Sequence, residues 1–322
     1  MSTNNFPIIN IPSFSNPASL ASLLSVSEQD LFRITSSVDN LYKPGKILQK
    51  KNGELRRTHD AKKPLKDLHE IIKNRILKKV VYPYYLLGGI ADPFKPRNCT
   101  NNALIHSGKK ILIAEDIENF FPSSSSDIVF NIWKLCFKFS PKIADILTKL
   151  TTYQNQLPQG WKTSGYLANL VFWDNEPDLV RDFEKRGYSY SRFIDDIAIS
   201  SNQFINDNQK SYIISRIYSM LRLKGYKPKR TKHEIQTQIK SMHLTGLGIN
   251  RKRPTVPRNR RNNVRLLVYN LEKRHRHEGD THQYREDWIS VSGKVGHIRS
   301  FHNNEWEKLK FRLNKIKPND KV

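Results

Sequence analysis

Two adjacent carboxylates, Asp195 and Asp196, lie in the middle of an apolar stretch of the chain. The neighbouring residues Phe193, Ile194 and Ile197 favour β-strands, whereas aspartate is depleted from strands. This pattern predicts a tight β-hairpin that carries the two acids at its turn. Adjacent acids repel each other, and apolar surroundings raise their pKa unless a cation lies close by. A solvated β-turn would explain the same residues, so other segments are needed to distinguish a turn from a reactive site.

A further acid, Asp116, ends a short apolar run that begins at Ile111 and is followed by Phe120 and Phe121. The run is too short to span a membrane and is typical of a buried strand. If this strand lies beside the hairpin, Asp116 and Asp195 form a pocket for divalent cations. Carboxylate oxygens, completed by water and substrate phosphates, are the usual ligands of Mg²⁺. Two such ions, about 3.5–4 Å apart, bind the attacking and leaving oxygens in phosphoryl transfer.

The order of these pieces resembles the palm motifs of reverse transcriptases. Four segments carry the resemblance: Asp116 with Phe120-Phe121 for the first motif, residues 157–164 (LPQGWKTS) with Asn169-Leu170 for the second, residues 193–196 (FIDD) for the Tyr-x-Asp-Asp motif, and Gly225-Tyr226 with Lys232 for the fourth. Phe193 stands where tyrosine is usual, but no departure from the motifs removes a metal ligand. The resemblance covers roughly residues 40 to 315.

Two further segments are similar to boxes of bacterial retron enzymes. Residues 102–106 (NALIH) resemble an Asn-Ala-x-x-His box, and residues 244–247 (LTGL) resemble a Val-Thr-Gly box. Related antiphage reverse transcriptases share versions of both. A lone histidine at this position is most often structural, so His106 alone would not indicate chemistry.

The resemblance implies an α+β fold, the right-hand polymerase with fingers, palm and helical thumb, in which an antiparallel palm sheet is backed by helices. Its expected divisions are an N-terminal arm over residues 1–25, fingers over 26–108, a palm with fingers insertions over 109–248, and a thumb or RNA-binding C-terminal region over 249–322.

The resemblance also assigns the catalytic residues. Asp116 and Asp195 would hold two Mg²⁺ ions, with support from Asp196 and the backbone of Ile117. The residues expected to bind the incoming nucleotide are Lys51, Arg57, Phe121, Gln159, Gly160, Asn169 and Lys232.

Two of these assignments have plain alternatives. The bulk of Phe121 would exclude a 2′-hydroxyl and so select deoxynucleotides, although core packing would also explain a phenylalanine there. Lys232 could protonate the departing pyrophosphate or balance its charge, but an ordinary solvated lysine fits equally well.

The net charge of +25 and the sequence pI of about 10.0 indicate a polyanionic partner. An arginine-rich run without acids begins after Asn250, and its two prolines predict an extended segment before a helix starts near Asn263. It could be a solvated charged face. In a thumb it would contact the nucleic-acid backbone, which gives affinity rather than base specificity. The residues expected to contact nucleic acid are Asn102, His106, Thr245, Gly246, Arg251, Arg253, Arg258, Arg260, Arg261 and Arg265.

Hydrophobic periodicity predicts the remaining elements. The first 25 residues are rich in Ser, Asn and Pro and predict an extended or mobile arm. Residues 47–57 predict a hairpin whose Asn52-Gly53 turn places Lys50, Lys51, Arg56 and Arg57 at its tip. Helices are expected over residues 27–41, 64–80, 141–152, 167–180 with a break near Pro177, 209–223, 264–273, 287–299 and 304–316.

Composition excludes several classes of protein. The two cysteines, Cys99 and Cys136, support neither a disulfide framework nor a Cys-rich zinc site and fit a reducing cytoplasm. A zinc site at the histidines 275, 277 and 282 is disfavoured because cysteine partners are missing. The first 20 residues lack the pattern of a signal peptide, and no run approaches the roughly 20 apolar residues of a membrane helix.

The sequence therefore predicts an RNA-directed DNA polymerase that uses dNTPs. If it is a retron enzyme, the resemblance implies a cognate structured non-coding RNA as template, priming from a guanosine 2′-hydroxyl, a branched RNA–DNA product, an effector protein and antiphage defence. One alternative is a non-retron antiphage reverse transcriptase that primes differently, for example from a protein residue. Another is a non-catalytic RNA-binding scaffold with a polymerase-like palm, and a group II intron maturase fits less well.

Overall fold

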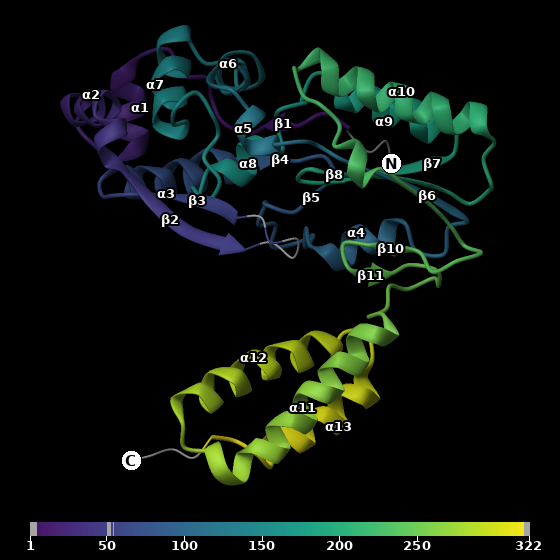
Figure 1. The fold of residues 1–322 in the computed structure, drawn as a ribbon. Helices are drawn as coiled ribbons and strands as arrows, with labels where there is room; N and C mark the ends of the chain where they lie inside the picture. The colour runs from purple at the N-terminus through teal and green to yellow at the C-terminus, as the bar shows by residue number, and fades with distance from the viewer. Residues whose placement is uncertain (1–4, 50–52, 54, 319–322) are drawn as a thin grey trace.

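A mixed five-stranded sheet carries the predicted acids (Figure 1). The computed structural model describes residues 5–49, 53 and 55–318. The strand order across the sheet is β5 (Leu86–Leu87), β7 (Tyr188–Phe193), β8 (Asp196–Ser201), β6 (Ile111–Asp116) and β9 (Glu234–Thr237). The expectation of a purely antiparallel sheet is wrong at one edge, because the short strand β5 runs parallel to β7. The other neighbours pair antiparallel.

Strand β6 is buried on both faces, which explains its continuous apolar sequence. Ile111 and Ile113 belong to the main core, whereas Leu112 belongs to a smaller cluster on the other face. The main-core face is covered by α9 (Glu176–Lys185) and α10 (Asp207–Leu223), and the other face by α4 (Cys99–Ile105) (Figure 1). Because side chains alternate along a strand, Asp116 lies on the same face as Leu112, away from α10.

The chain also forms a hairpin of β2 (Tyr42–Gln49) and β3 (Leu55–Ala61), with a group of helices beside it (Figure 1), which confirms the hairpin predicted around residues 47–57. Gly53 has a φ of +84°, as a tight turn requires, while Asn52 and the tip lysines 50 and 51 lie outside the described residues. The helices here are α1 (Pro17–Leu24), α2 (Glu28–Ser36), α3 (Leu65–Arg75), α6 (Ser126–Asn131) and α7 (Pro141–Thr151).

Short elements connect these parts. They are β1 (Ile8–Ile9), which pairs with β4 (Val80–Val81), the 3₁₀ turns η1 (Val38–Leu41), η2 (Leu77–Lys79) and η4 (Arg230–Lys232), the π-helical turn η3 (Ile132–Cys136), α5 (Phe120–Ser123), α8 (Ser164–Ala168), and the hairpin of β10 (His243–Leu244) and β11 (Leu247–Gly248).

Three local predictions are wrong. Residues 17–24 form a helix rather than an extended arm, because Leu20 and Leu24 are buried in the main core. The helix expected over residues 64–80 ends at Arg75, and the chain continues as η2 and β4. Pro177 does not break a helix but lies in the first turn of α9, where its missing N–H is not needed.

The C-terminal residues form a separate three-helix bundle (Figure 1). It consists of α11 (Arg258–Glu278), α12 (His282–Ile298) and α13 (Asn303–Asn314), with its own hydrophobic core around Val268 and Tyr284. Helix α11 begins earlier than the expected Asn263, directly after Pro257, so part of the arginine-rich run is helical rather than extended. Among the described residues, no helix is long and apolar enough to cross a membrane.

Candidate active site

The turn between β7 and β8 presents Asp195 and Asp196, as predicted. Ile194 and Asp195 form the two-residue connection, since Phe193 pairs with Asp196 across the hairpin. Ile194 has a φ of +61°, a left-handed conformation that is strained for a β-branched residue. Such strain persists only where surrounding contacts fix the backbone. Here the Ile194 N–H donates to the Leu87 carbonyl at 3.2 Å, and its carbonyl accepts from Arg192 Nη1 at 3.0 Å.

The sheet places Asp116 directly opposite Asp196. The two residues are cross-strand partners in the β6–β8 pair, and directly opposed side chains have Cβ atoms roughly 4.5–5.5 Å apart. The next residue, Ile117, donates its N–H to the Asp195 carbonyl at 3.0 Å. Three acids from two separate segments therefore meet at one end of the sheet.

Burial and mutual repulsion disfavour the ionised forms of Asp195 and Asp196. Burial first, and then the charge of Asp116, raise the pKa of Asp195. Burial, followed by the charges of Asp195 and Asp116, raises the pKa of Asp196 to about 7. The cations that oppose these shifts are Lys232, whose Nζ contacts Asp116 Oδ2, and Arg56, which faces Asp195. The pKa values of Asp195 and Asp196 stay raised despite these cations, so further positive charge would stabilise their ionised forms.

A cavity of about 790 Å³ lies over the acids. The acids Asp116 and Asp195 line it, as does Ile117. Of the residues predicted to bind nucleotide, it brings together Arg57, Phe121, Gln159 and Lys232. Its remaining lining residues are Leu55, Arg56, His59, Asn119, Phe120, Pro122 and Lys229. Lys51 lies outside the described residues.

Four polar lining residues were not assigned to the site from the sequence: Arg56, His59, Asn119 and Lys229. Arg56 belongs to the basic residues predicted at the tip of the hairpin. The sequence indicated that this tip is basic, but it did not show which of the neighbouring arginines lines the site. In the structure, the Gln159 side-chain oxygen, in the orientation that suits its neighbours, accepts from Arg56 Nε and Nη2 at 3.3 Å. This contact connects the hairpin to the segment that resembles the second palm motif.

Two predicted nucleotide-binding residues do not line this cavity. A Cβ on Gly160 would lie 2.6 Å from the His59 carbonyl oxygen, so this glycine permits close approach of strand β3 rather than of a ligand. Asn169 is only 1% exposed, and its amide donates to the carbonyls of Gly88 at 3.1 Å and Gly165 at 2.7 Å. Both residues serve the packing around the site instead.

Asn102 and His106, which the resemblance assigned to nucleic-acid contact, both have buried side chains. His106 bonds through Nδ1 to Ser200 Oγ at 2.7 Å and through Nε2 to Ser191 Oγ at 2.8 Å. Ser191 in turn donates to Asn102 Oδ1 at 2.6 Å. Burial lowers the pKa of His106 to about 3, so the ring is neutral. The network fixes α4 against the two strands that carry the acidic turn.

The second retron-like box packs against the first. Thr245 and Gly246 form the tight turn between β10 and β11, both with positive φ. The Thr245 hydroxyl donates to the Cys99 carbonyl at 3.2 Å, at the start of α4. Gly246 is exposed, and its carbonyl accepts from Arg260 Nη1 at 3.3 Å. The Thr245 hydroxyl and the Gly246 carbonyl therefore both have partners within the protein.

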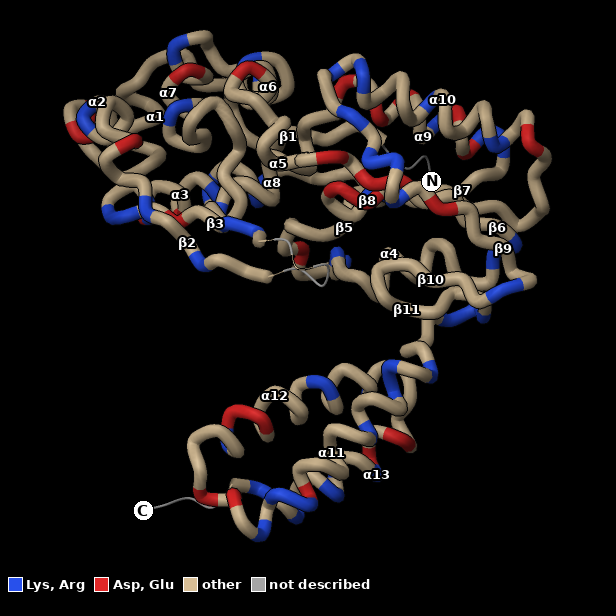
Figure 2. The backbone as a smooth tube through the Cα atoms, viewed as in Figure 1, with Lys and Arg blue, Asp and Glu red and all other residues tan. Residues whose placement is uncertain are grey.

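The predicted arginines lie where the sheet body meets the bundle, and Figure 2 shows basic residues continuing along the bundle helices. Arg261 and Arg265 pair with Glu305 of α13, at 2.6 and 2.7 Å. Although the run itself contains no acid, the fold supplies one. The exposed members are Arg251, Arg253, Arg258, Arg260 and Arg265. Arg251, Arg258 and Arg261 line a polar cavity of about 490 Å³ together with His302.

The donor chemistry of the acidic site suits a hard divalent cation. Carboxylate oxygens are the ligands that Mg²⁺ prefers, and a dication would relieve the repulsion that raises these pKa values. Among the residues that the structure describes, no three His, Cys, Asp or Glu side chains are grouped so that they could hold a metal ion. A metal bound here would therefore take further oxygen ligands from water and substrate.

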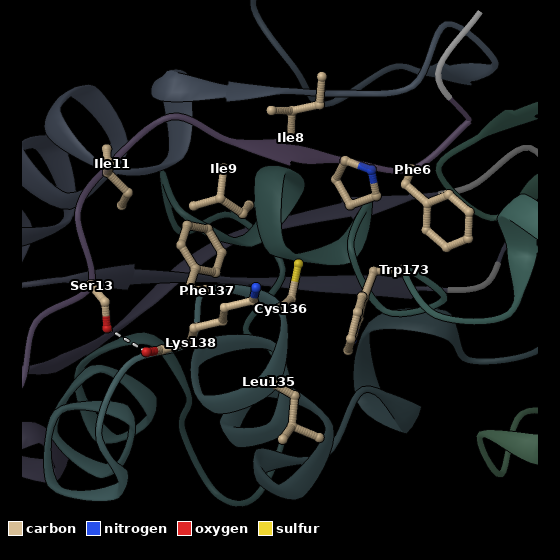
Figure 3. A pocket seen from close by; sticks show the side chains of 11 residues that line it. Phe6, Ile8, Ile9, Ile11, Ser13, Leu135, Cys136, Phe137, Lys138 and Trp173 are labelled. Atoms are coloured by element: carbon tan, nitrogen blue, oxygen red, sulfur yellow. Dashed lines mark hydrogen bonds between the residues drawn. The ribbon is translucent and has the colours of Figure 1, made fainter.

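A different kind of cavity, about 430 Å³ in volume, lies between the N-terminal segment and η3 (Figure 3). Phe6, Ile9, Phe137 and Trp173 are among the residues that line it, and Lys138 is the one charged member of the lining set. Burial raises the pKa of the nearby Cys136 thiol to about 12, so this cysteine is unreactive. The cavity has no group suited to phosphoryl transfer.

The raised pKa of Asp196 makes a prediction about stability. Its pKa rises from 3.8 to about 7 on folding, so between these values the folded chain holds a proton that the unfolded chain has lost. The free energy of unfolding should therefore fall as the pH rises through this range. The variant Asp196→Asn lacks this loss. In EDTA it should be more stable than the parent by on the order of 1–4 kcal/mol above about pH 7.

Urea denaturation of both proteins at a series of pH values checks this. The advantage of Asp196→Asn should be small near about pH 4 and should grow as the pH rises. A difference that does not vary with pH would contradict the electrostatic description of the site.

Comparison with known proteins agrees with the motifs. The family described as "Reverse transcriptase (RNA-dependent DNA polymerase)" matches residues 48–250. The Retron Se72 reverse transcriptase of Salmonella heidelberg (strain 579083-10) is 32% identical over 98% of this chain and 83% of its own length. The Retron Ec48 reverse transcriptase of Escherichia coli is 26% identical over 93% of this chain and 75% of its own.

A solved structure of telomerase from Candida albicans, in complex with the TWJ fragment of telomeric RNA, aligns with 66% of this chain and 41% of that chain. The TM-score is 0.41 and the identity 11%. The sequence matches are sufficient without it, since the first relative covers nearly the whole chain. This chain belongs to the reverse transcriptase family and, within it, is a retron reverse transcriptase, an RNA-dependent DNA polymerase.

Proposed function

We propose that DNA synthesis takes place at the cavity over Asp116 and Asp195, with the chain arranged as the right hand of a polymerase. Residues 26–108, which include the hairpin β2–β3, are the fingers, residues 109–248 are the palm with fingers insertions, and the bundle with the preceding arginine-rich run (249–322) is the thumb. The observation that supports this most strongly is the register that pairs Asp116 with Asp196 beneath a cavity lined by Arg56, Arg57 and Lys232. The cavity therefore contains both carboxylates that can bind metal ions and cationic side chains that can bind phosphates.

In this proposal, Asp116 and Asp195 hold two Mg²⁺ ions, with Asp196 in support and Ile117 contributing its backbone. Bound Mg²⁺ neutralises the developing charge on the attacking and leaving oxygens. The primer hydroxyl loses its proton to solvent and attacks the α-phosphate of a dNTP, and the bond between the α-phosphorus and the pyrophosphate oxygen breaks. Arg56 and Arg57 contact the triphosphate, and Lys232 leaves Asp116 to balance the charge of the pyrophosphate. Positioning and charge neutralisation supply most of the acceleration in such reactions.

Removal of the two hairpin acids tests the assignment. Asp195→Asn with Asp196→Asn should lower dNTP incorporation by roughly 10²-fold or more, because no paired carboxylates remain to bind metal. RNA binding and the circular dichroism spectrum should stay near those of the parent. Asp207→Asn, an exposed acid at the start of α10, is the matched control and should retain activity. Incorporation by the double variant at the parental rate would show that the site lies elsewhere.

Phe121 is the residue that we expect to select deoxyribonucleotides over ribonucleotides. Phe121 lines the cavity close to Asp116, and we propose that its ring excludes the 2′-hydroxyl of a ribonucleotide. Phe121→Val should therefore raise rNTP incorporation relative to dNTP by roughly 10-fold or more. Phe130→Val removes the same volume from a half-buried ring of the same core and is the control. If both variants keep the parental preference for dNTP over rNTP, Phe121 contributes only to core packing.

We further propose that the template is a cognate structured non-coding RNA and that synthesis starts from a 2′-hydroxyl of a guanosine in it. The exposed arginines around the bundle support RNA backbone binding, and an effector protein with a role in antiphage defence in the cytoplasm would complete such a system. The rival is a reverse transcriptase that primes from a protein residue.

Nuclease and protease treatment of the purified product separates these two modes of priming. RNase should shorten the attached species and leave DNA with a branched RNA remnant, whereas protease should leave the product unchanged. DNA that protease alone releases would support protein priming. Sequencing the RNA that co-purifies with the protein would identify the template, and failure of the parent to incorporate any dNTP would favour a non-catalytic RNA-binding scaffold.

A further inference from the structure

The acidic turn is attached to a fully buried ion pair. Arg192, the residue before Phe193, is 0% exposed, and its partner Glu176 is 1% exposed. The pair is bidentate, with Nε to Oε1 at 2.7 Å and Nη2 to Oε2 at 2.9 Å. Tyr190 also donates to Glu176 Oε1 at 2.7 Å. Glu176 lies in the first turn of α9, where the helix dipole favours a negative charge.

The guanidinium uses its remaining donors on backbone carbonyls around the site. Nη1 donates to the carbonyl of Ile194 at 3.0 Å, and Nη2 donates to the carbonyl of Asn169 at 3.0 Å. The guanidinium also lies over the Phe172 ring, 5.3 Å from its centroid. One side chain thereby connects α9, the segment resembling the second palm motif, and the strained residue of the acidic turn.

The other side of the turn is fixed by residues 87–89 (LGG), the glycine loop. Ile194 donates its N–H to Leu87, and a Cβ on Gly89 would lie 2.5 Å from Ile194 Cδ1. A Cβ on Gly88 would lie 3.0 Å from the Phe193 ring. The loop therefore holds the N–H and the side chain of Ile194, while Arg192 holds its carbonyl. Both contacts are needed if Ile194 is to keep its left-handed conformation beside two acids that repel each other.

A buried ion pair is weak evidence for stability, because desolvation of the two charges offsets much of their attraction. We propose that Arg192 is a positioning residue for DNA synthesis: by holding the Ile194 carbonyl from a bidentate anchor on Glu176, it fixes the orientation of Asp195 and Asp196 for metal binding. This inference rests on the proposed role of the two acids. A lysine could keep the charge but could not bond Glu176 and the carbonyls of Ile194 and Asn169 together.

Three variants test the proposal in the full-length protein. Arg192→Lys keeps the charge but loses the planar fork, and Glu176→Gln keeps the shape of the anchor but not its charge. The double variant Arg192→Met/Glu176→Leu replaces the pair with apolar side chains, which can preserve stability. Arg312 and Glu272 of the bundle form a partly exposed bidentate pair, at 2.8 and 2.7 Å, so Arg312→Lys is a control for the loss of a bidentate contact away from the acids.

Two readouts separate positioning from a merely structural role. Mn²⁺ binding, measured by electron paramagnetic resonance without nucleotide turnover, should weaken by roughly 10-fold in Arg192→Lys and in the apolar double variant. The kcat for dNTP incorporation should fall by a similar factor, while the KM for dNTP and the Kd for RNA stay within about twofold. Arg312→Lys should match the parent in every measurement.

Folded Arg192 variants with parental Mn²⁺ binding and kcat would overturn the proposal, as would loss of native circular dichroism in all three variants, which would show that the pair serves folding alone. If the parental protein incorporates dNTPs and the Asp195→Asn variant does not, the proposed function stands. A failure of the positioning role can then be distinguished from a failure of the active site.

Discussion

The structure depends on holding like charges together at the end of a buried sheet. Asp116 is fixed opposite Asp196 by the register of β6 and β8, and Asp195 is fixed by the turn between β7 and β8. Burial and mutual repulsion raise the pKa of Asp195 and of Asp196, so the acids would separate if the backbone allowed it. The surrounding fold opposes that relaxation: it pairs the strands, holds Ile194 in a left-handed conformation and places α4 and α9 behind the hairpin.

The cations of the cavity come from two different parts of the chain. Arg56 and Arg57 come from β3, and Lys232 comes from η4. The bundle has its own hydrophobic core, whereas the hairpin and the sheet share the main one. This division suits a reaction in which one body holds the reacting phosphate and another holds the nucleic-acid backbone.

Much of the site could be predicted from short local patterns. The strand ending at Asp116 and the hairpin at Asp195 and Asp196 follow from apolar runs interrupted by acids, and both are confirmed. The sequence could not show that Asn102, His106 and Asn169 are buried, because a motif gives residue identity but not which side of a helix or strand the side chain takes. It also could not supply Glu305, which reaches Arg261 from α13 only in the folded chain.

The most direct test of the central claim is the anomalous diffraction of Mn²⁺ in crystals of the protein with dNTP and template–primer. The account predicts anomalous peaks in contact with carboxylate oxygens of both Asp116 and Asp195, beside the triphosphate. Peaks that touch only one of these acids, or that lie outside the cavity above them, would contradict it.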